Sequence, residues 1–315
     1  MRGEKESHLK FIRDLTDAGL FHPPLPSDWA SFEKYRHNML FGDLSFTSFY
    51  IWTRTMHYRI RITSGGILVI GLDTNRDIVI YVLAQGDIRP IDIELAGLYR
   101  IFRENGIAMR IECVSESELQ YFSGLSFNTE VSYDDRFSDY IYDNSEFIAL
   151  DGRRNKTKRH EYSRFVKHHP YAALVSGSLH DQKVRSDCEN IFDRWCQTHR
   201  CKDCVFGCEK EAFARMCDIF DNSRHLLGIV YDGDCPISFG IGELLTDDCV
   251  FFHIQKNAAP IEGLTYYLHR EMALRMHPNP KYINWGEDMG LEGIRRNKSR
   301  YAPVELRRKY TLLIR

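Results

Sequence analysis

The stretch YINWGEDMGLEGIRRNKSRY, residues 282–301, places two adjacent carboxylates in front of a basic segment. Glu287 and Asp288 follow a strand-like run, and Arg295 and Lys298 come within about three helical turns of them. Acyl transfer from an ester requires groups that hold an ammonium, stabilise an oxyanion and accept a proton. Carboxylates serve the first and third tasks, and cationic side chains serve the second. The spacing is therefore compatible with a catalytic site at these residues.

Both acids can reach one site only if the strand ends before them. Neighbouring strand residues point to opposite faces, so a continued strand would separate Glu287 from Asp288. Gly286 permits the strand to end. We then expect both acids to line a cleft of the second domain, partly exposed and without committed partners. The alternative is that the acids cap the following helix and the bases form a solvated face.

The composition is that of a packed globular protein with little net charge. Its 315 residues suffice for two domains, and 43% of them are hydrophobic. Lys and Arg number 42 against 44 Asp and Glu, so binding of a polyanion requires a local patch. The charged N-terminus is no secretory signal, and nine cysteines without an export signal indicate reduced thiols. No apolar run is long enough for a membrane span, so we expect a cytoplasmic protein.

The two halves of the chain show the same order of expected elements, β-β-β-α-β-α. In the first half a helix ends at Gly106, and Ser115 and Glu118 have capping-box spacing. The expected strands cover residues 56–62, 66–72, 77–83, 107–114, 226–231, 235–244, 249–256, 281–285 and 307–314. The expected helices cover residues 91–106, 115–122, 263–276 and 291–301. We predict two α/β domains with mixed (α+β) sheets, at residues 1–147 and 148–315, with the site in the second.

This order resembles the acetyltransferase-type (GNAT) fold, and particular stretches resemble one bacterial family. They are GDLSFTSFYIW (42–52), DYIYDNSEFIALDGRRNKTKRHEYSRF (139–165), GLTYYLHREMA (263–273) and residues 282–310. The family is that of the C-terminal domain of phosphatidylglycerol lysyltransferases and its soluble relatives, built as tandem GNAT-like domains. The resemblance implies aminoacyl transfer from aminoacyl-tRNA to an amine, peptide or lipid head-group acceptor.

The resemblance favours a catalytic site at residues 287–298 over a helix cap, and it also adds residues to that site. It places His253 on a strand beside the central cleft, where it is a candidate base, although a lone His on a strand is more often structural. Asn284, Trp285 and Tyr301 lie beside the acids in the same stretch, and we expect them to contact the substrate.

Two other functions stay open. An acyl-CoA-dependent N-acetyltransferase would share the fold, but the segment QKNAAPIEGLT lacks the glycine-rich phosphate cradle. It offers Pro260, Glu262 and a single glycine, Gly263, so CoA is disfavoured. We expect no bound cofactor, and aminoacyl-tRNA as co-substrate. The third possibility is a non-catalytic module that binds tRNA or another polyanion.

A basic segment joins the predicted domains. DGRRNKTKRHEYSRFVKHH, residues 151–169, includes Arg153, Lys158 and Arg159. As a helix it could meet phosphates of a tRNA acceptor arm or anionic head groups, and we predict such contacts for these three residues. The alternative is a solvated helix face.

Four cysteines, Cys196, Cys201, Cys204 and Cys208, have C-x4-C-x2-C-x3-C spacing. Such a group can bind zinc or an iron–sulfur cluster. Without a second C-x2-C pair the signal is weak, so we predict reduced cysteines in a loop and no metal.

Overall fold

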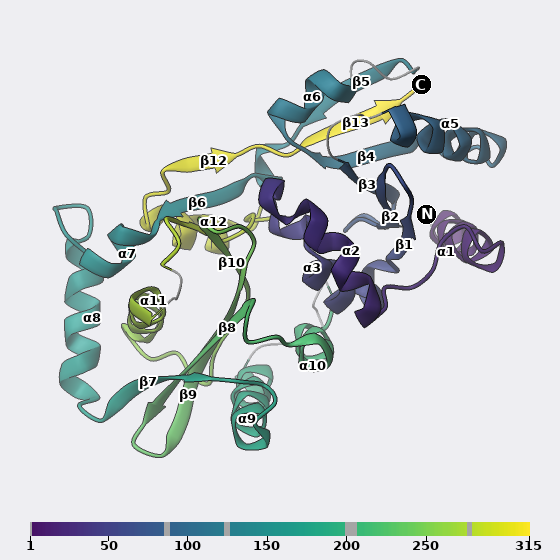
Figure 1. Ribbon diagram of the computed structural model, residues 1–315. Helices are drawn as coiled ribbons and strands as arrows, with labels where there is room; N and C mark the ends of the chain where they lie inside the picture. The colour runs from purple at the N-terminus through teal and green to yellow at the C-terminus, as the bar shows by residue number, and fades with distance from the viewer. Residues whose placement is uncertain (1, 85–88, 123–126, 199–206, 276–278) are drawn as a thin grey trace. The chain divides into compact units, whose positions relative to one another are not determined.

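The computed structural model describes residues 2–84, 89–122, 127–198, 207–275 and 279–315 (Figure 1). Its described strands form two mixed sheets, which confirms the predicted mixed α/β fold. The chain divides into two compact units. Unit 1 holds the chain up to Ser138 and the C-terminal Arg308–Arg315, and unit 2 holds most of Asp139–Arg307. No helix among the described residues is long and apolar enough to cross a membrane.

The sheet of unit 1 has the strand order β1-β2-β3-β4-β13-β5. Its strands are β1 (Arg59–Ile62), β2 (Gly66–Leu72), β3 (Ile78–Ala84), β4 (Met109–Val114), β5 (Thr129–Tyr133) and β13 (Tyr310–Ile314). β2 and β3 are apolar and buried on both faces, as befits central strands. β3 and β4 are parallel neighbours, paired at Ile80 and Ile111.

The helices of unit 1 form an apolar core with this sheet. They are α1 (Arg2–Asp17), η1 (Pro26–Asp28), α2 (Trp29–Phe32), η2 (Glu33–Asn38), η3 (Gly42–Leu44), α3 (Phe46–Ile51), α4 (Thr53–Met56), α5 (Arg89–Glu104), α6 (Glu116–Phe122) and η4 (Asp135–Phe137). Phe11 and Phe102 meet edge to face in the core, with ring centroids 4.9 Å apart. At the start of α6 the Ser115 backbone N–H donates to Oε2 of Glu118 at 2.8 Å, as the capping-box spacing predicts.

The sheet of unit 2 has the strand order β12-β6-β11-β10-β9-β8-β7. Its strands are β6 (Asp139–Asp143), β7 (Ala172–Gly177), β8 (His225–Asp232), β9 (Cys235–Leu244), β10 (Cys249–Asn257), β11 (Tyr282–Asn284) and β12 (Glu305–Arg307). β8, β9 and β10 lie close to their predicted bounds. β10 and β11 are parallel, whereas the other described neighbours in this sheet are antiparallel.

Helices cover both faces of this sheet (Figure 1). They are α7 (Asn144–Ala149), α8 (Lys156–His168), α9 (Gln182–Thr198), α10 (Glu209–Ile219), α11 (Leu264–Arg275) and α12 (Glu292–Arg300). α11 packs on one face, where a side chain at Gly240 would meet the Met272 sulfur at 2.8 Å. α9 covers the other face, where Phe192 lies 5.4 Å from the Phe239 ring. Alternate residues of β9 therefore face α11 and α9.

The units exchange strands relative to the predicted domains. The chain divides after Ser138 and not after residue 147, because β6 pairs with β11 and β12 in unit 2. Conversely, β13 was expected in the second domain but pairs with β4 and β5 in unit 1. Element order along the chain does not reveal which sheet a connecting or terminal strand joins.

Candidate active site in unit 2

The strands β10 and β11 of unit 2 run side by side and then part. They pair through residues 249–251 and 282–284. Beyond this point β10 has a bulge relative to β9 between Phe252 and Ile254, with His253 as the inserted residue. The regular strand β11 ends at Asn284, before Gly286 as predicted, although the backbone of Trp285 and Gly286 keeps hydrogen bonds to Tyr140 of β6. Bulges re-aim side chains and are frequent next to active sites.

His253 is oriented by a carboxylate that the sequence analysis did not single out. Its Nε2 lies 2.7 Å from Oε2 of Glu243 on β9, and the two side chains are 1% and 9% exposed. An ionised carboxylate only accepts hydrogen bonds, so Nε2 carries the proton and Nδ1 of the neutral ring keeps its lone pair. His253 makes no other hydrogen bond among the described residues. An imidazole held in this way can accept a proton from a substrate.

Asp288 anchors the loop between β11 and α12 and is 1% exposed. Its Oδ1 accepts the Gly290 backbone N–H at 2.7 Å, and its Oδ2 accepts the Tyr140 hydroxyl at 2.6 Å. Arg295 of α12 donates from Nε to Oδ2 at 2.8 Å. Burial alone raises the pKa of this carboxyl, but the hydrogen bonds outweigh it and the pKa is lowered. The expectation that Asp288 is partly exposed and uncommitted is therefore wrong, because β6 and α12 enclose it.

Lys298, predicted as a catalytic cation, is committed to the backbone of the same loop. Its Nζ donates to the carbonyl oxygens of Trp285 at 2.5 Å and Glu287 at 2.6 Å. Within the loop, Met289 has a φ of 54°, a left-handed conformation that a non-glycine residue adopts when its surroundings fix it. Lys298 thus shapes the loop that carries Glu287.

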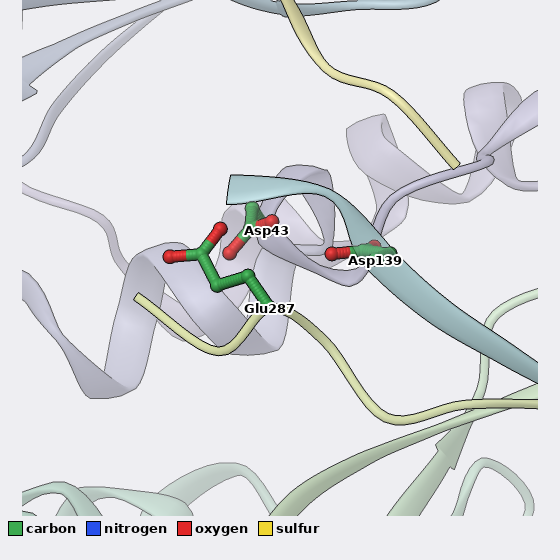
Figure 2. A group of neighbouring side chains, drawn as sticks. All are labelled: Asp43, Asp139 and Glu287. Carbon is green, nitrogen blue, oxygen red and sulfur yellow. The ribbon is translucent and has the colours of Figure 1, made fainter. Parts of the chain in front are cut away.

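Glu287 lies beside a second carboxylate, which is Asp139 and not Asp288. Figure 2 shows Asp139 at the start of β6 and Glu287 on the loop after β11. One carboxylate oxygen of each lies within 4.8 Å of the other. Asp139 is fully buried, and its Oδ2 accepts a hydrogen bond of 2.8 Å from Nδ2 of Asn284. Two carboxylates this close favour a bound cation, because it relieves their mutual repulsion.

Tyr301 and Trp285 belong to an aromatic cluster beside the loop. Their ring centroids are 4.9 Å apart, and Phe147 of α7 stacks on Tyr301 at 4.9 Å. The Tyr301 hydroxyl lies 2.9 Å from Nδ1 of His269 on α11. Burial lowers the pKa of His269 to about 3, so the ring is neutral and accepts this hydrogen bond. Tyr301 is 4% exposed, so any contact with a ligand involves the rim of this cluster.

The basic residues predicted to contact phosphates separate into two groups. Arg153 and Arg159 are exposed, and Nη1 of Arg159 donates to the Gly152 carbonyl at 3.1 Å. Lys158, by contrast, is 4% exposed, and its Nζ lies 4.8 Å from the centre of the Tyr301 ring. Lys158 therefore does not belong to the exposed basic face, because its side chain turns into unit 2.

The cysteine prediction falls partly outside the described residues, because Cys201 and Cys204 do. Cys196 lies in α9 and Cys208 directly before α10.

Three residues that were not predicted complete the site: Glu243, Asp139 and Tyr140. Of these, Glu243 could have been recognised from the sequence. Glu243 is the sole charge in the strand-like run CPISFGIGEL. A charge in a buried strand requires a partner, so a lone one is a site candidate. Tyr140 gave no such signal, because its partner Asp288 is 148 residues away.

A family model described as "Phosphatidylglycerol lysyltransferase, C-terminal" matches residues 38–313. This match covers most of the chain, including β6, β9, β10, β11 and α12, which build the site. The C-terminal domain that defines the family has a GNAT-like fold. No curated protein matches the chain.

Two solved structures share the fold along nearly the whole chain. A conserved protein of unknown function from Bacteroides thetaiotaomicron has a TM-score of 0.82 at 20% identity, and the match covers 94% of this chain and 99% of that one. L-PGS from Bacillus licheniformis has a TM-score of 0.66 at 13% identity, covering 93% of this chain and 92% of that one. At these identities the likeness extends to the fold alone.

Proposed function

Because this chain belongs to the family of phosphatidylglycerol lysyltransferase C-terminal domains, we propose that it transfers an aminoacyl group from aminoacyl-tRNA to an amine, peptide or lipid acceptor. The observation that carries the proposal is the 2.7 Å hydrogen bond between Glu243 and His253 at the bulge of β10. His253 accepts the proton of the attacking nucleophile at Nδ1, and Glu243 stabilises the imidazolium that forms.

The carboxylate pair of Asp139 and Glu287 holds the α-ammonium of the aminoacyl group. Phe251 lies between the carboxylate pair and the base. Its ring centroid is 4.8 Å from that of His253. On the other side, a side chain at Gly286 would meet the Phe251 ring at 3.4 Å. The nucleophile bonds to the ester carbonyl carbon, the ester C–O bond breaks, and His253 returns the proton to the leaving tRNA oxygen.

Arg295 and Lys298 are positioning residues in this proposal. Arg295 is held by Asp288 and Lys298 by the loop backbone, so both cations support the loop between β11 and α12. Together they fix the loop on which Glu287 reaches Asp139. Such rigid support of the residues that contact substrate is needed because small displacements cost large factors in rate.

The start of α11 does not favour a CoA-dependent N-acetyltransferase. Gly263, at φ 80°, directly precedes this helix, and a side chain there would lie 2.2 Å from the Glu161 carbonyl oxygen of α8. The backbone of α8 therefore covers the helix end at which backbone N–H groups would have to meet a pyrophosphate. This packing supports a donor other than CoA.

The proposal is tested by transfer of labelled amino acids from a mixture of aminoacyl-tRNAs. The acceptors are phosphatidylglycerol vesicles, peptides with free amines and small amines. We expect the wild type to label one acceptor class and His253→Gln to be at least about 100-fold slower. The control His180→Gln, at an exposed position of unit 2, should transfer at the wild-type rate.

Equal rates for His253→Gln and the wild type would contradict the proposal. So would a wild type that transfers to none of the acceptors. Salt-sensitive binding of tRNA without transfer would instead favour the non-catalytic alternative, in which the exposed basic residues of α8 bind a polyanion.

A further inference from the structure

Lys158 has a largely buried side chain and no polar partner among the described residues. It is 4% exposed, and it forms no hydrogen bond or ion pair with any described residue. Its Nζ lies 4.8 Å from the centre of the Tyr301 ring. Glu146 is the acid whose charge acts on Lys158. It already forms an ion pair with Arg154 at 2.8 Å and accepts a hydrogen bond from Nδ2 of Asn155 at 3.1 Å. Lys158 Nζ is not among the fully buried atoms that lack a partner, so the ammonium reaches solvent at the end of a buried side chain, where an anion can meet it.

Two further features at this position offer donors and positive charge without an acceptor. Lys158 lies in the first turn of α8, which contains no acidic residue and has no side-chain cap, so the positive end of the helix dipole is not compensated. Helical side chains lean toward the N-terminus of their helix, which keeps the ammonium near this end. The second feature is the Trp285 indole, which packs on the same Tyr301 ring. Its Nε1–H has no acceptor among the described residues.

From these contacts we propose that Lys158, the N-terminal end of α8 and the Trp285 indole N–H form a binding site for a phosphate group beside Tyr301. All three offer positive charge or hydrogen-bond donors, which suits a ligand that only accepts. A helix N-terminus and a lysine are a frequent pair of phosphate-binding groups in proteins. The site goes beyond the proposed function, since it stands on groups that the transfer step does not use.

The charge state of Lys158 agrees with this assignment. Burial and the neighbouring Arg154 lower the pKa of Lys158 to about 8, while Glu146 raises it. The ammonium is therefore held in its charged form only weakly, and a bound phosphate would stabilise that form. The phosphate comes either from free phosphate or from an ester that forms part of a larger ligand.

The test is calorimetric titration of the full chain with inorganic phosphate, glycerol 3-phosphate and dimethyl phosphate. We expect Lys158→Met to weaken binding at least about 10-fold and Trp285→Phe, which keeps a ring but loses the N–H, by a smaller factor. Lys156→Met is the matched control, because Lys156 is exposed on the same turn of α8, and its affinity should stay within twofold. Tighter binding of the esters than of inorganic phosphate would identify a larger ligand as the source, and the reverse order a free anion.

Lys158→Met should fold, because it replaces an unpartnered cation on a largely buried side chain by an apolar side chain of similar length, and its melting temperature should match or exceed that of the wild type. Equal affinities of Lys158→Met and the wild type would overturn the assignment. Equal losses in Lys156→Met and Lys158→Met would also overturn it, because they would indicate attraction to the basic surface. A wild type that binds none of the probes at millimolar concentration would overturn it as well. None of these outcomes depends on transfer activity, so they are separate from the test of the proposed function.

Discussion

Among the described strands, each unit has one pair of parallel neighbours, β3 and β4 in unit 1 and β10 and β11 in unit 2. Different residues follow the point at which the pairing ends in each unit. In unit 2 the divergence of β10 and β11 carries the hydrogen-bonded pair of Glu243 and His253. In unit 1, β3 and β4 pair at Ile80, and the next residue, Tyr81, packs against Tyr58 and Phe49 with ring centroids 5.9 and 5.3 Å away. Aromatic rings thus surround the residue that follows the paired Ile80 of β3, whereas β10 carries an imidazole two residues beyond its last residue paired with β11, Phe251. The same architecture supports structure in one unit and candidate chemistry in the other, so the side chains and not the fold decide.

Unit 1 does contain a largely buried carboxylate near the end of this pairing, but not one paired with an imidazole. Glu112 of β4 accepts a 3.1 Å hydrogen bond from Arg110. Burial raises the pKa of Glu112 to about 7, although Arg110 and Lys309 oppose this. Glu112 is thus the natural counterpart of Glu243 in any test that compares the units.

The largest effect on stability is expected at two aspartates whose carboxylates accept hydrogen bonds from the backbone of a turn. Asp288 pins the loop of unit 2, and Asp73 of unit 1 accepts the backbone N–H groups of Asn75 and Asp77 at 2.8 Å each. Replacing the buried Asp288 by Ala leaves several donors without acceptors and should lower the free energy of unfolding by about 2–4 kcal/mol. Replacing Asp73, whose backbone hydrogen bonds are exposed to solvent, should lower it by less. Asp288→Ala should also slow transfer more than about 10-fold, because its loop carries Glu287. Urea denaturation and transfer rates check this, and equal slowing by Asp73→Ala in folded protein would break the comparison.

The pH dependence of stability should have opposite signs for two buried histidines of unit 2 and for Glu112 of unit 1. Burial lowers the pKa of His269 to about 3 and that of His225 to about 4, so these rings bind protons only after unfolding as the pH falls below about 6.5. Each therefore costs about 1.4 kcal/mol per pH unit between about 6.5 and its folded pKa. Glu112 has a raised pKa, so it loses its proton on unfolding, and stability falls as the pH rises from about 4.5 to 7.

Urea denaturation of His269→Gln and Glu112→Gln at several pH values checks these signs. The stability of His269→Gln relative to the wild type should increase as the pH is lowered from 6.5 toward 4. That of Glu112→Gln should increase as the pH is raised from 4.5 to 7. Relative stabilities that do not change with pH would show that these groups are not buried as described.

The smallest effect is expected on the exposed face of α12. Arg296 forms an ion pair with Glu292 at 2.6 Å, and the two side chains are 65% and 84% exposed. Arg296→Ala should change the free energy of unfolding by less than about 0.5 kcal/mol and leave transfer unchanged. Arg295→Ala, one residue earlier, should impair transfer because it releases Asp288. A strong loss of transfer in Arg296→Ala would mean that the basic face, and not the loop anchor, is the functional part of α12.

The sequence was informative where local pattern decides the structure and misleading where distant partners do. β2 and β9 were predicted with their observed bounds, because each is an apolar run between turn residues. The end of β11 before Gly286 was likewise readable from the residues. The burial of Asp288 was not, because it depends on Tyr140 of β6, which lies 148 residues away along the chain. The pairing of Glu287 with Asp139 stayed hidden for the same reason.

The central claim is that the catalytic residues lie where β10 and β11 diverge in unit 2. The matched variants Glu243→Gln and Glu112→Gln test this claim most directly. Each replaces one largely buried carboxylate by a nearly isosteric amide, in unit 2 and unit 1 respectively. In one transfer assay, kcat/KM of Glu243→Gln should fall about 10- to 1000-fold, because His253 loses its orienting carboxylate. That of Glu112→Gln should stay within about twofold of the wild type. Unchanged transfer in Glu243→Gln, or an equal loss in Glu112→Gln, would contradict the account.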